Sequence, residues 1–401
     1  HEQLIRKSSC SLQNVIENGA GSRKIDRNSH AFDLNLLEHP DFADLDYNEY
    51  LFPMMMIPLQ TARGCYGSCE FCAIPAGSNS GFRERAVGKI IADILTIQQH
   101  TIEKYGKKAT YFKLMDDTSS PGTLLRLARE IEAQKIGAQW ETFVRLERAF
   151  EEKDMMEQLY RGGCRKLMWG LETNDPSILQ RMSKKITPLS TSKILNASAT
   201  AGILNFVFIL IGFPAETRAQ RDRLVKYIIE NKDIHVLTIA TFDLTKKSPI
   251  QNNFAFPNTY GLNCDKANDF EVRLPYTVNN MNWKEMMVSE AHRMLINIIR
   301  ERSDIGFMSL FPDQVRGILC NRYGNTWGRE YLTEFGEDNI KRMLLATEEY
   351  IDGFGKSEGV DLSILPEPIK REHTRTREDI KSIAGAIKRR KQYEMRRIKQ
   401  L

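Results

Sequence analysis

Residues 55–72 read MMIPLQTARGCYGSCEFC, and this stretch decides how the chain folds. The apolar run 55–59 has the length and composition of a buried β-strand. Directly after it come Cys65, Cys69 and Cys72, in the spacing Cys-x3-Cys-x2-Cys. The cysteines therefore lie on a loop at the carboxyl end of a strand, where ligands collect in sheets built from parallel strands.

Short apolar runs of the same kind recur along the chain and alternate with amphipathic helical stretches, a pattern typical of consecutive βα units around a parallel sheet. After the first run, five more can be counted, at residues 110–115, 139–146, 166–171, 203–211 and 234–242. The sequence therefore predicts an α/β fold, a partial (β/α)6 TIM-type barrel that is open on one side and carries a helical C-terminal cap.

Two of the helices have readable ends. The helix that follows the cysteine loop has an apolar face between Val87 and Ile102, and Gly106 is its expected stop. The next helix should begin with Ser120 as N-cap and Pro121 at the first helical position.

Changes in pattern divide the chain into three parts. Residues 1–53 lack a convincing periodicity and form an N-terminal lead-in segment. Residues 54–245 form the core. Residues 246–401 form the C-terminal helical cap and basic tail, with Asn- and Pro-rich connections over 248–280 and helical stretches near 283–302 and 374–400.

Composition narrows the class of protein. With 401 residues, 41% of them hydrophobic, the chain can bury a large core, and no window approaches the ~18 uninterrupted apolar residues of a membrane span. Seven cysteines in so long a chain do not suit a secreted disulfide scaffold, so we expect a metal site in the reducing cytoplasm.

The net charge is +5, and residues 371–401 hold eleven Lys or Arg against four Asp or Glu. This tail could touch nucleic acid, although a solvated helix face explains it as well.

The cysteine spacing favours an iron–sulfur cluster. Three thiolates suit three irons of a 4Fe-4S cubane and leave the fourth iron free to bind another ligand. Phe71, beside the last cysteine, offers an aromatic wall against water and for an adenine ring. The alternative is a structural zinc site, which needs four ligands, and no His falls between His39 and His100 to supply the fourth.

The loop and the six runs together resemble the radical S-adenosylmethionine (radical SAM) superfamily over roughly residues 54–245. The resemblance implies that the open iron chelates the amino and carboxylate groups of SAM, and that an electron from the cluster cleaves SAM to methionine and a 5′-deoxyadenosyl radical. It also implies an electron donor such as flavodoxin or ferredoxin as a partner.

The resemblance extends to polar residues after the second strand. The family usually has Gly-Gly-Glu there, in contact with the SAM amino group, whereas this chain has Asp116 and Asp117 after Leu114-Met115. A contact from either carboxylate to SAM is the functional interpretation. The alternative is that Asp117 helps to cap the following helix.

Three further strand ends carry candidate SAM contacts. Glu172, in Trp169-Gly-Leu-Glu-Thr, resembles the acid that meets the ribose or the methionyl end of SAM, and Gly212 resembles the turn beside the adenine. Arg145 ends the third strand and points to the same place, although a buried ion pair with Glu172 would explain it equally well. Arg83 and Arg85 could contact an acidic substrate or the carboxylate of SAM, although solvated loop charges are the favoured interpretation. No catalytic residue can be assigned.

One branch of the family is the closest in pattern, the cobalamin-dependent enzymes with an N-terminal cobalamin-binding domain. Residues 40–45 with Tyr50, and the lead-in 57–65, carry this similarity. It implies an enzyme that modifies an unreactive carbon of a peptide or small molecule by methylation, rearrangement or cyclisation. A nucleic-acid-modifying methylthiotransferase and a non-catalytic iron–sulfur sensor remain the alternatives.

We predict that the chain binds cobalamin weakly or not at all. In the cobalamin-dependent branch a flavodoxin-like domain supplies one face of the corrinoid pocket, and about 50 residues before the core are too few to form such a domain. Either this domain has been cut away, so that cobalamin would be used through a domain absent here, or the protein works without it. Equilibrium binding of hydroxocobalamin tests this expectation. Tight, stoichiometric uptake would contradict it, whichever reaction the chain takes part in.

Overall fold

The computed structural model describes residues 15–17, 23–25, 33–42, 55–77, 81–252, 261–264, 271–309, 316, 324–326 and 328–329. The predicted helix near 374–400 and the basic tail lie outside these residues, as do residues 43–45 and Tyr50, which carry part of the similarity to the cobalamin-dependent branch.

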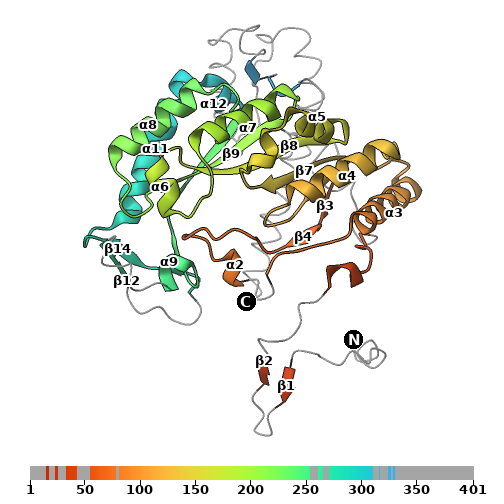
Figure 1. Cartoon of the computed structure of the whole chain (residues 1–401), viewed down its shortest axis with the longest axis horizontal. Coiled ribbons are helices and arrows are strands. Elements are labelled where there is room, and N and C mark those ends of the chain that lie inside the picture. The colour runs from red at the N-terminus through yellow and green to blue at the C-terminus, as the bar shows by residue number, and fades with distance from the viewer. Residues whose placement is uncertain are drawn as a thin grey trace, which may run out of the picture.

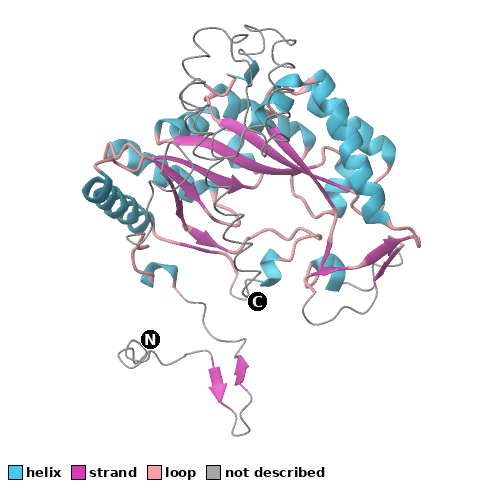
Figure 2. Cartoon of the chain, turned by 180° about the vertical axis from the view of Figure 1, so that it is seen from behind, coloured by secondary structure: helices cyan, strands magenta, loops and turns pink. Residues whose placement is uncertain are grey.

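A six-stranded parallel sheet forms the centre of the molecule (Figures 1 and 2). Its order is β10-β9-β8-β7-β6-β3, and every neighbouring pair is parallel. The strands are β3 (Met56–Leu59), β6 (Tyr111–Leu114), β7 (Gln139–Val144), β8 (Cys164–Glu172), β9 (Leu204–Ile211) and β10 (Val236–Thr241). All six predicted strands are confirmed, with bounds within two residues of those expected. Because β10 and β3 stand at opposite ends of the order, the sheet is a partial barrel.

Helices connect successive strands and lie along one face of the sheet, while Figure 2 turns the other face towards the viewer. They are α3 (Val87–Tyr105), α4 (Pro121–Ala133), α5 (Lys153–Arg161), α6 (Pro176–Arg181), α7 (Pro188–Thr200) and α8 (Arg218–Glu230), with the 3-10 turn η3 (Arg148–Glu151) before α5. Their apolar sides and the outward side chains of the strands form one continuous core.

The predicted helix ends are confirmed. Gly106 ends α3 in the left-handed conformation, with φ of 63°, which costs a glycine little. The Ser120 side chain accepts a hydrogen bond from the backbone of Thr123, and Pro121 opens α4. These local signals needed no information from the rest of the chain.

A buried ion pair lies on the opposite side of the strands from the helices. Lys166 Nζ is 2.9 Å from Glu141 Oε2, and Lys113 Nζ is 3.3 Å from Glu141 Oε1. Tyr111 donates a hydrogen bond of 2.9 Å to the same carboxylate. Lys113, Glu141 and Lys166 are neighbours across β6, β7 and β8, so strand register alone brings the three charges together.

The sequence did not predict several short elements at both ends of the described chain. The lead-in segment holds an antiparallel pair, β1 (Val15–Glu17) and β2 (Arg23–Ile25), and the turn η1 (Leu34–Leu36). The stretch expected as connections holds α9 (Pro249–Asn252) and the strands β12 (Leu262–Cys264), β13 (Arg273–Leu274) and β14 (Tyr276–Val278); β13 pairs with β11 (Leu244–Thr245), and β12 with β14. Elements of two to four residues are too short to show a period.

The helical stretch predicted near 283–302 is confirmed as α11 (Trp283–Glu301), followed by α12 (Ser303–Ser309). Helix α11 packs beside α8 and β10, where a further crossover helix would lie (Figure 1). At its far end Arg302 is buried and donates to the carbonyl oxygens of Ile228 (3.0 Å), Asn231 (2.9 Å) and Ile234 (2.7 Å). Asp304 balances its charge at 2.8 Å.

Asn205 and His235 form buried hydrogen bonds at the same end of the sheet, where β9 and β10 begin. Asn205 accepts a hydrogen bond from Trp169 Nε1 (2.8 Å), and its backbone N–H donates to His235 Nδ1 (2.9 Å). Burial, followed by the positive charges of Arg329 and Arg302, lowers the pKa of His235 to about 3. Within the described residues, no helix has both the length and the apolar character needed to cross a membrane.

His235 should make the fold less stable as the pH falls. Its folded pKa of about 3 lies below the unfolded value near 6.5, so the unfolded chain binds the proton more tightly between these values. The contribution is complete above pH 6.5 and is lost progressively below it. We expect about 2 kcal/mol less stability at pH 5 than at pH 7 from this group alone.

The measurement is urea unfolding at both pH values for the natural chain and for His235→Asn, whose amide oxygen can accept from Asn205. The variant should lose about this much of the pH dependence. His292→Gln removes an exposed histidine and serves as the control. Equal pH dependence in the natural chain and His235→Asn would contradict the prediction.

Candidate functional site

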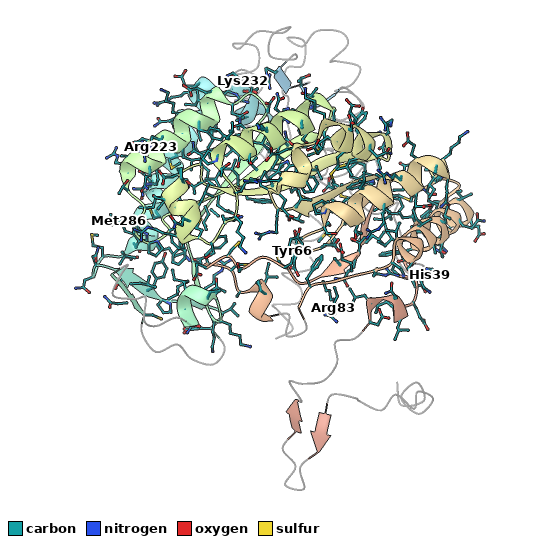
Figure 3. All side chains as sticks on the ribbon, in the orientation of Figure 1. His39, Tyr66, Arg83, Arg223, Lys232 and Met286 are labelled. Atoms are coloured by element: carbon teal, nitrogen blue, oxygen red, sulfur yellow. The ribbon has the colours of Figure 1, made fainter. Side chains whose placement is uncertain are left out.

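The three cysteines lie on the loop after β3, as predicted. The loop runs from β4 (Ala62–Arg63), through the cysteines, to α2 (Ile74–Gly77), and β4 pairs antiparallel with β5 (Arg83–Glu84) to close its base. Gly64 begins the loop with φ of 79°, a left-handed conformation that favours glycine. Figure 3 labels Tyr66 on this loop, facing the ends of the strands.

Asp116 fixes the start of the loop. Its buried carboxylate accepts from the backbone N–H groups of Thr61 (2.8 Å) and Ala62 (2.7 Å), and from the hydroxyls of Thr61 and Ser119. A carboxylate has about four acceptor positions, and these four donors use them. Burial raises the pKa of Asp116, and the hydrogen bonds from Thr61, Ala62 and Ser119 oppose that effect. Asp116 therefore holds the start of the loop in place. A contact between Asp116 and SAM stays a prediction.

Asp117 holds the next part of the loop. Its carboxylate accepts from the backbone N–H of Gly64 at 3.1 Å. The expected cap on the following helix is made instead by Ser120. Neighbouring aspartates after β6 thus bind successive segments of the loop that follows β3.

Arg85 fixes the loop from the other side, and the expectation of a solvated charge is wrong. Its side chain is buried and paired with Asp93, and it donates to the carbonyl of Gln60 (3.3 Å), while its backbone N–H donates to the carbonyl of Thr61 (2.8 Å). His39 Nδ1 lies 2.5 Å from the same Asp93. The lead-in segment is therefore tied, through one buried carboxylate, to the arginine that holds the loop.

Arg145, directly after β7, contacts the thiols. Its Nη1 donates to Cys69 Sγ at 3.4 Å, and Gly67 N donates to Cys65 Sγ at 3.3 Å. Burial disfavours the arginine's charge, but the hydrogen bond to Cys69 and the charges of Cys69 and Cys65 raise the pKa of Arg145 overall. Burial is also the main reason that the pKa of the Cys72 thiol is raised. Cys72 N bonds to Cys69 O at 3.0 Å, which closes the turn between these two cysteines.

Glu172, at the end of β8, is paired with Lys184 rather than with Arg145. Lys184 Nζ lies 3.0 Å from Glu172 Oε1 and 2.9 Å from the Gly170 carbonyl, and Arg145 has Glu147 as its acid at 4.0 Å. The alternative of an Arg145–Glu172 ion pair is therefore wrong. Glu172 has φ of 63°, unusual for a residue with a side chain, beside an irregularity in the pairing of β8 with β9.

Phe71 lies next to this pair. Lys184 Nζ is 6.0 Å from the centre of its ring, within the range of a cation–π contact. The loop beside it is docked by backbone bonds from Glu70 N to Met182 O (3.1 Å) and from Ile250 N to Glu70 O (2.9 Å). Sequence reasoning missed Lys184 because it comes between two helices, twelve residues after its partner, with no local pattern.

Gly212, directly after β9, is the turn that the sequence predicted. Its φ of 76° is left-handed, and a Cβ atom there would lie 2.4 Å from Met287 Cγ. Its N–H donates to Glu216 (2.6 Å), and its carbonyl accepts from Trp283 Nε1 (2.7 Å). Burial raises the pKa of Glu216 to about 7, against the Gly212 hydrogen bond and the charge of Arg221. Only a glycine fits here without strain in the backbone and a shift of the Met287 side chain.

The structure therefore brings the predicted residues to one edge of the sheet. These groups lie at the carboxyl ends of β3, β6, β7, β8 and β9 in turn: the cysteine loop, Asp116, Arg145, Glu172 and Gly212. Parallel strands end at the same edge of a sheet. Among these groups, direct contacts join the Cys69 thiol to Arg145, and Lys184 to both Phe71 and Glu172.

The comparisons with known proteins agree with this arrangement. Residues 59–228 match the Radical SAM superfamily. The solved structure of OxsB, a cobalamin-dependent S-adenosylmethionine radical enzyme with aqua-cobalamin and S-adenosylmethionine bound, shares the fold with a TM-score of 0.59. At 12% identity it covers 93% of this chain and 57% of that chain. Residues 59–228 form a radical SAM domain.

Curated relatives match parts of this chain at low identity. An uncharacterized methyltransferase of Pyrococcus horikoshii is 26% identical over 186 residues, which are 46% of this chain and 39% of the relative. A bacteriochlorophyllide d C-12(1)-methyltransferase of Chlorobaculum tepidum is 24% identical over 188 residues, 44% of this chain and 38% of the relative. The ribosomal protein uS12 methylthiotransferase RimO of Porphyromonas gingivalis is 22% identical over 269 residues, 62% of this chain and 56% of the relative. The chain thus spans about two fifths to just over half of these proteins.

A radical SAM domain implies a 4Fe-4S cluster and SAM, and the residues on the cysteine loop fit the cluster. Cys65, Cys69 and Cys72 are free thiols on one loop, with a guanidinium beside them to offset negative charge. Among the described residues, no three His, Cys, Asp or Glu side chains converge as a single metal ion requires. A cubane is a larger body than one ion, and its thiolates bind different irons, so it accepts a wider spacing.

Proposed function

We propose that this radical SAM domain binds a 4Fe-4S cluster through Cys65, Cys69 and Cys72 and belongs to an enzyme that modifies an unreactive carbon of a peptide or small molecule. The observation that carries the proposal is the position of three free thiols at the sheet edge where Arg145 and Glu172 also lie. With an electron from a donor such as flavodoxin or ferredoxin, the bound cluster and SAM supply a 5′-deoxyadenosyl radical.

The loop's anchors give the domain a rigid place for the cysteines. Asp116, Asp117 and Arg85 bind the backbone from Gln60 to Gly64, directly before Cys65. A binding site needs its ligating side chains held by such outer contacts, because a small displacement of a ligand costs affinity. These residues act through the loop and need no contact with the cofactor.

Glu172 and Lys184 are proposed as the polar contacts to SAM. Lys184 keeps the Glu172 carboxylate oriented at the end of β8, and each side chain retains some exposure, 12% for Glu172 and 8% for Lys184. One can accept from ribose hydroxyls or an amino group, and the other can donate to a carboxylate. Phe71 and the Gly212 turn are proposed to border the adenine. The flat ring of Phe71 can stack on a base, and the glycine lets the backbone approach it closely.

Methyl transfer is the favoured reaction because two of the relatives are named methyltransferases, although the chain covers only 39% and 38% of their lengths. The methylthiotransferase RimO, similar over 62% of this chain, supports methylthio transfer as the second candidate. The two are separated by the mass of the modified substrate, which gains one CH2 unit in the first case and one CH2 unit plus sulfur in the second.

Replacing one cysteine should remove the cluster. After anaerobic reconstitution with iron and sulfide, we expect about four irons per chain, and Cys69→Ala should lose most of them because a cubane needs its three thiolates. Cys164→Ala removes a buried thiol from β8 and should keep the iron. A full cluster in Cys69→Ala would refute the ligand assignment. 5′-Deoxyadenosine formed from SAM under a reductant then distinguishes an enzyme from an iron–sulfur sensor.

Glu172→Gln should weaken SAM binding without removing the cluster. A partly buried, charge-assisted hydrogen bond contributes about 1.5 to 3 kcal/mol, which corresponds to at least a tenfold loss of affinity. Equilibrium SAM binding to the reconstituted chain measures the effect, and iron content confirms that the cluster remains. Glu157→Gln, on the outer helix α5, is the matched control. Unchanged SAM affinity in Glu172→Gln would leave Glu172 with a structural role only.

A further inference from the structure

The Arg145 guanidinium lies in a closely defined place against the cysteine loop. Nη1 is 3.4 Å from Cys69 Sγ, and the guanidinium carbon is 5.8 Å from the centre of the Tyr66 ring. Its side chain is 18% exposed, so water screens the charge only in part. A cation therefore sits beside a proposed cluster ligand, on the side of the loop that faces β7.

Neighbouring groups hold the guanidinium there. Glu147 lies 4.0 Å from Arg145 Nε and also accepts a hydrogen bond from the Tyr66 hydroxyl. A Cβ atom on Gly67 would lie 1.9 Å from Nη1, so the loop approaches the guanidinium as closely as a bare backbone permits. Any side chain at position 67 would push Arg145 away from the sulfur.

The other buried cations around the loop are directed elsewhere. Lys184 binds Glu172 and a carbonyl, and Arg85 binds Asp93 and a carbonyl. Their charges are largely offset by a carboxylate at hydrogen-bond distance. The carboxylate that neighbours Arg145, that of Glu147, is farther away, at 4.0 Å. Arg145 Nη1 instead donates to the sulfur of Cys69.

Hydrogen bonds to the sulfurs and nearby charge are two of the properties that set the potential of an iron–sulfur cluster. Reduction adds one electron, and thus one negative charge, while no bond forms or breaks. A cation within a few ångströms interacts more favourably with the reduced state than with the oxidised state. An N–H donor to a ligand sulfur acts in the same direction, because it withdraws electron density from the cluster.

We propose that Arg145 raises the reduction potential of the cluster, so that it acts on electron entry rather than on SAM binding. The inference rests on the proposed function, because it takes Cys69 as a cluster ligand. Arg145 is a positioning residue under this proposal: it need not touch SAM or the substrate, and it acts through the sulfur of Cys69.

The test is a redox titration of the reconstituted chain without SAM, followed by the paramagnetic resonance signal of the reduced cluster, with dithionite as reductant. Arg145→Met removes the charge and the donors, and Arg145→Gln keeps a donor but no charge. We expect both to hold four irons and to be harder to reduce, Arg145→Met by at least tenfold in the equilibrium constant, which is about 59 mV for one electron. Arg148→Met removes an exposed charge three residues away and should match the natural chain.

The outcomes are distinguishable from failure of the proposed function. A natural chain that binds no cluster refutes the function itself. A variant with four irons and an unchanged potential overturns the role of Arg145, and weaker SAM binding in that variant would make Arg145 a SAM contact instead. Loss of iron from both Arg145→Met and Arg145→Gln would also overturn the proposal, in favour of a role in cluster assembly.

Discussion

The buried carboxylate of Asp116 joins the cysteine loop to the sheet, and the geometry of the site depends on it. Four donors from two segments converge on this one side chain, so the loop after β3 cannot shift without exposing or orphaning a buried charge. The parallel order of the strands makes the contact possible, since β3 and β6 are neighbours that end at the same edge. This attachment fixes the start of the loop, directly before the first thiol.

Long elements and helix ends could be predicted from the sequence because their signals are local. Six apolar runs became six strands, and Ser120, Pro121 and Gly106 end helices as their chemistry requires. The strand-end candidates also reached one edge, because that follows from the parallel order alone. Strands of two or three residues, such as β12 and β13, escaped prediction because they carry no period.

Partner choice among charged residues could not be predicted in the same way. Arg145 and Glu172 end neighbouring strands, which made an ion pair between them an equal alternative, yet Glu172 is bound by Lys184 from the segment between α6 and α7. Arg85 was expected to be a solvated loop charge, but it is buried against Asp93 of the following helix, α3. Each of these pairs depends on how segments between the strands return to the sheet, and spacing along the chain does not encode that return.

The position of Arg302 affects which amino-acid substitutions the protein can accept during evolution. It binds three carbonyl oxygens around the start of β10, and Asn205 and His235 join β9 to β10 nearby, so much of the buried polar support lies at the amino ends of the strands. The cysteines and their neighbours lie at the carboxyl ends. Substitutions at the carboxyl ends of the strands that spare Asp116 and Arg85 therefore leave the contacts of Arg302, Asn205 and His235 intact. Such a division lets one scaffold acquire new substrates while its folding free energy stays nearly constant.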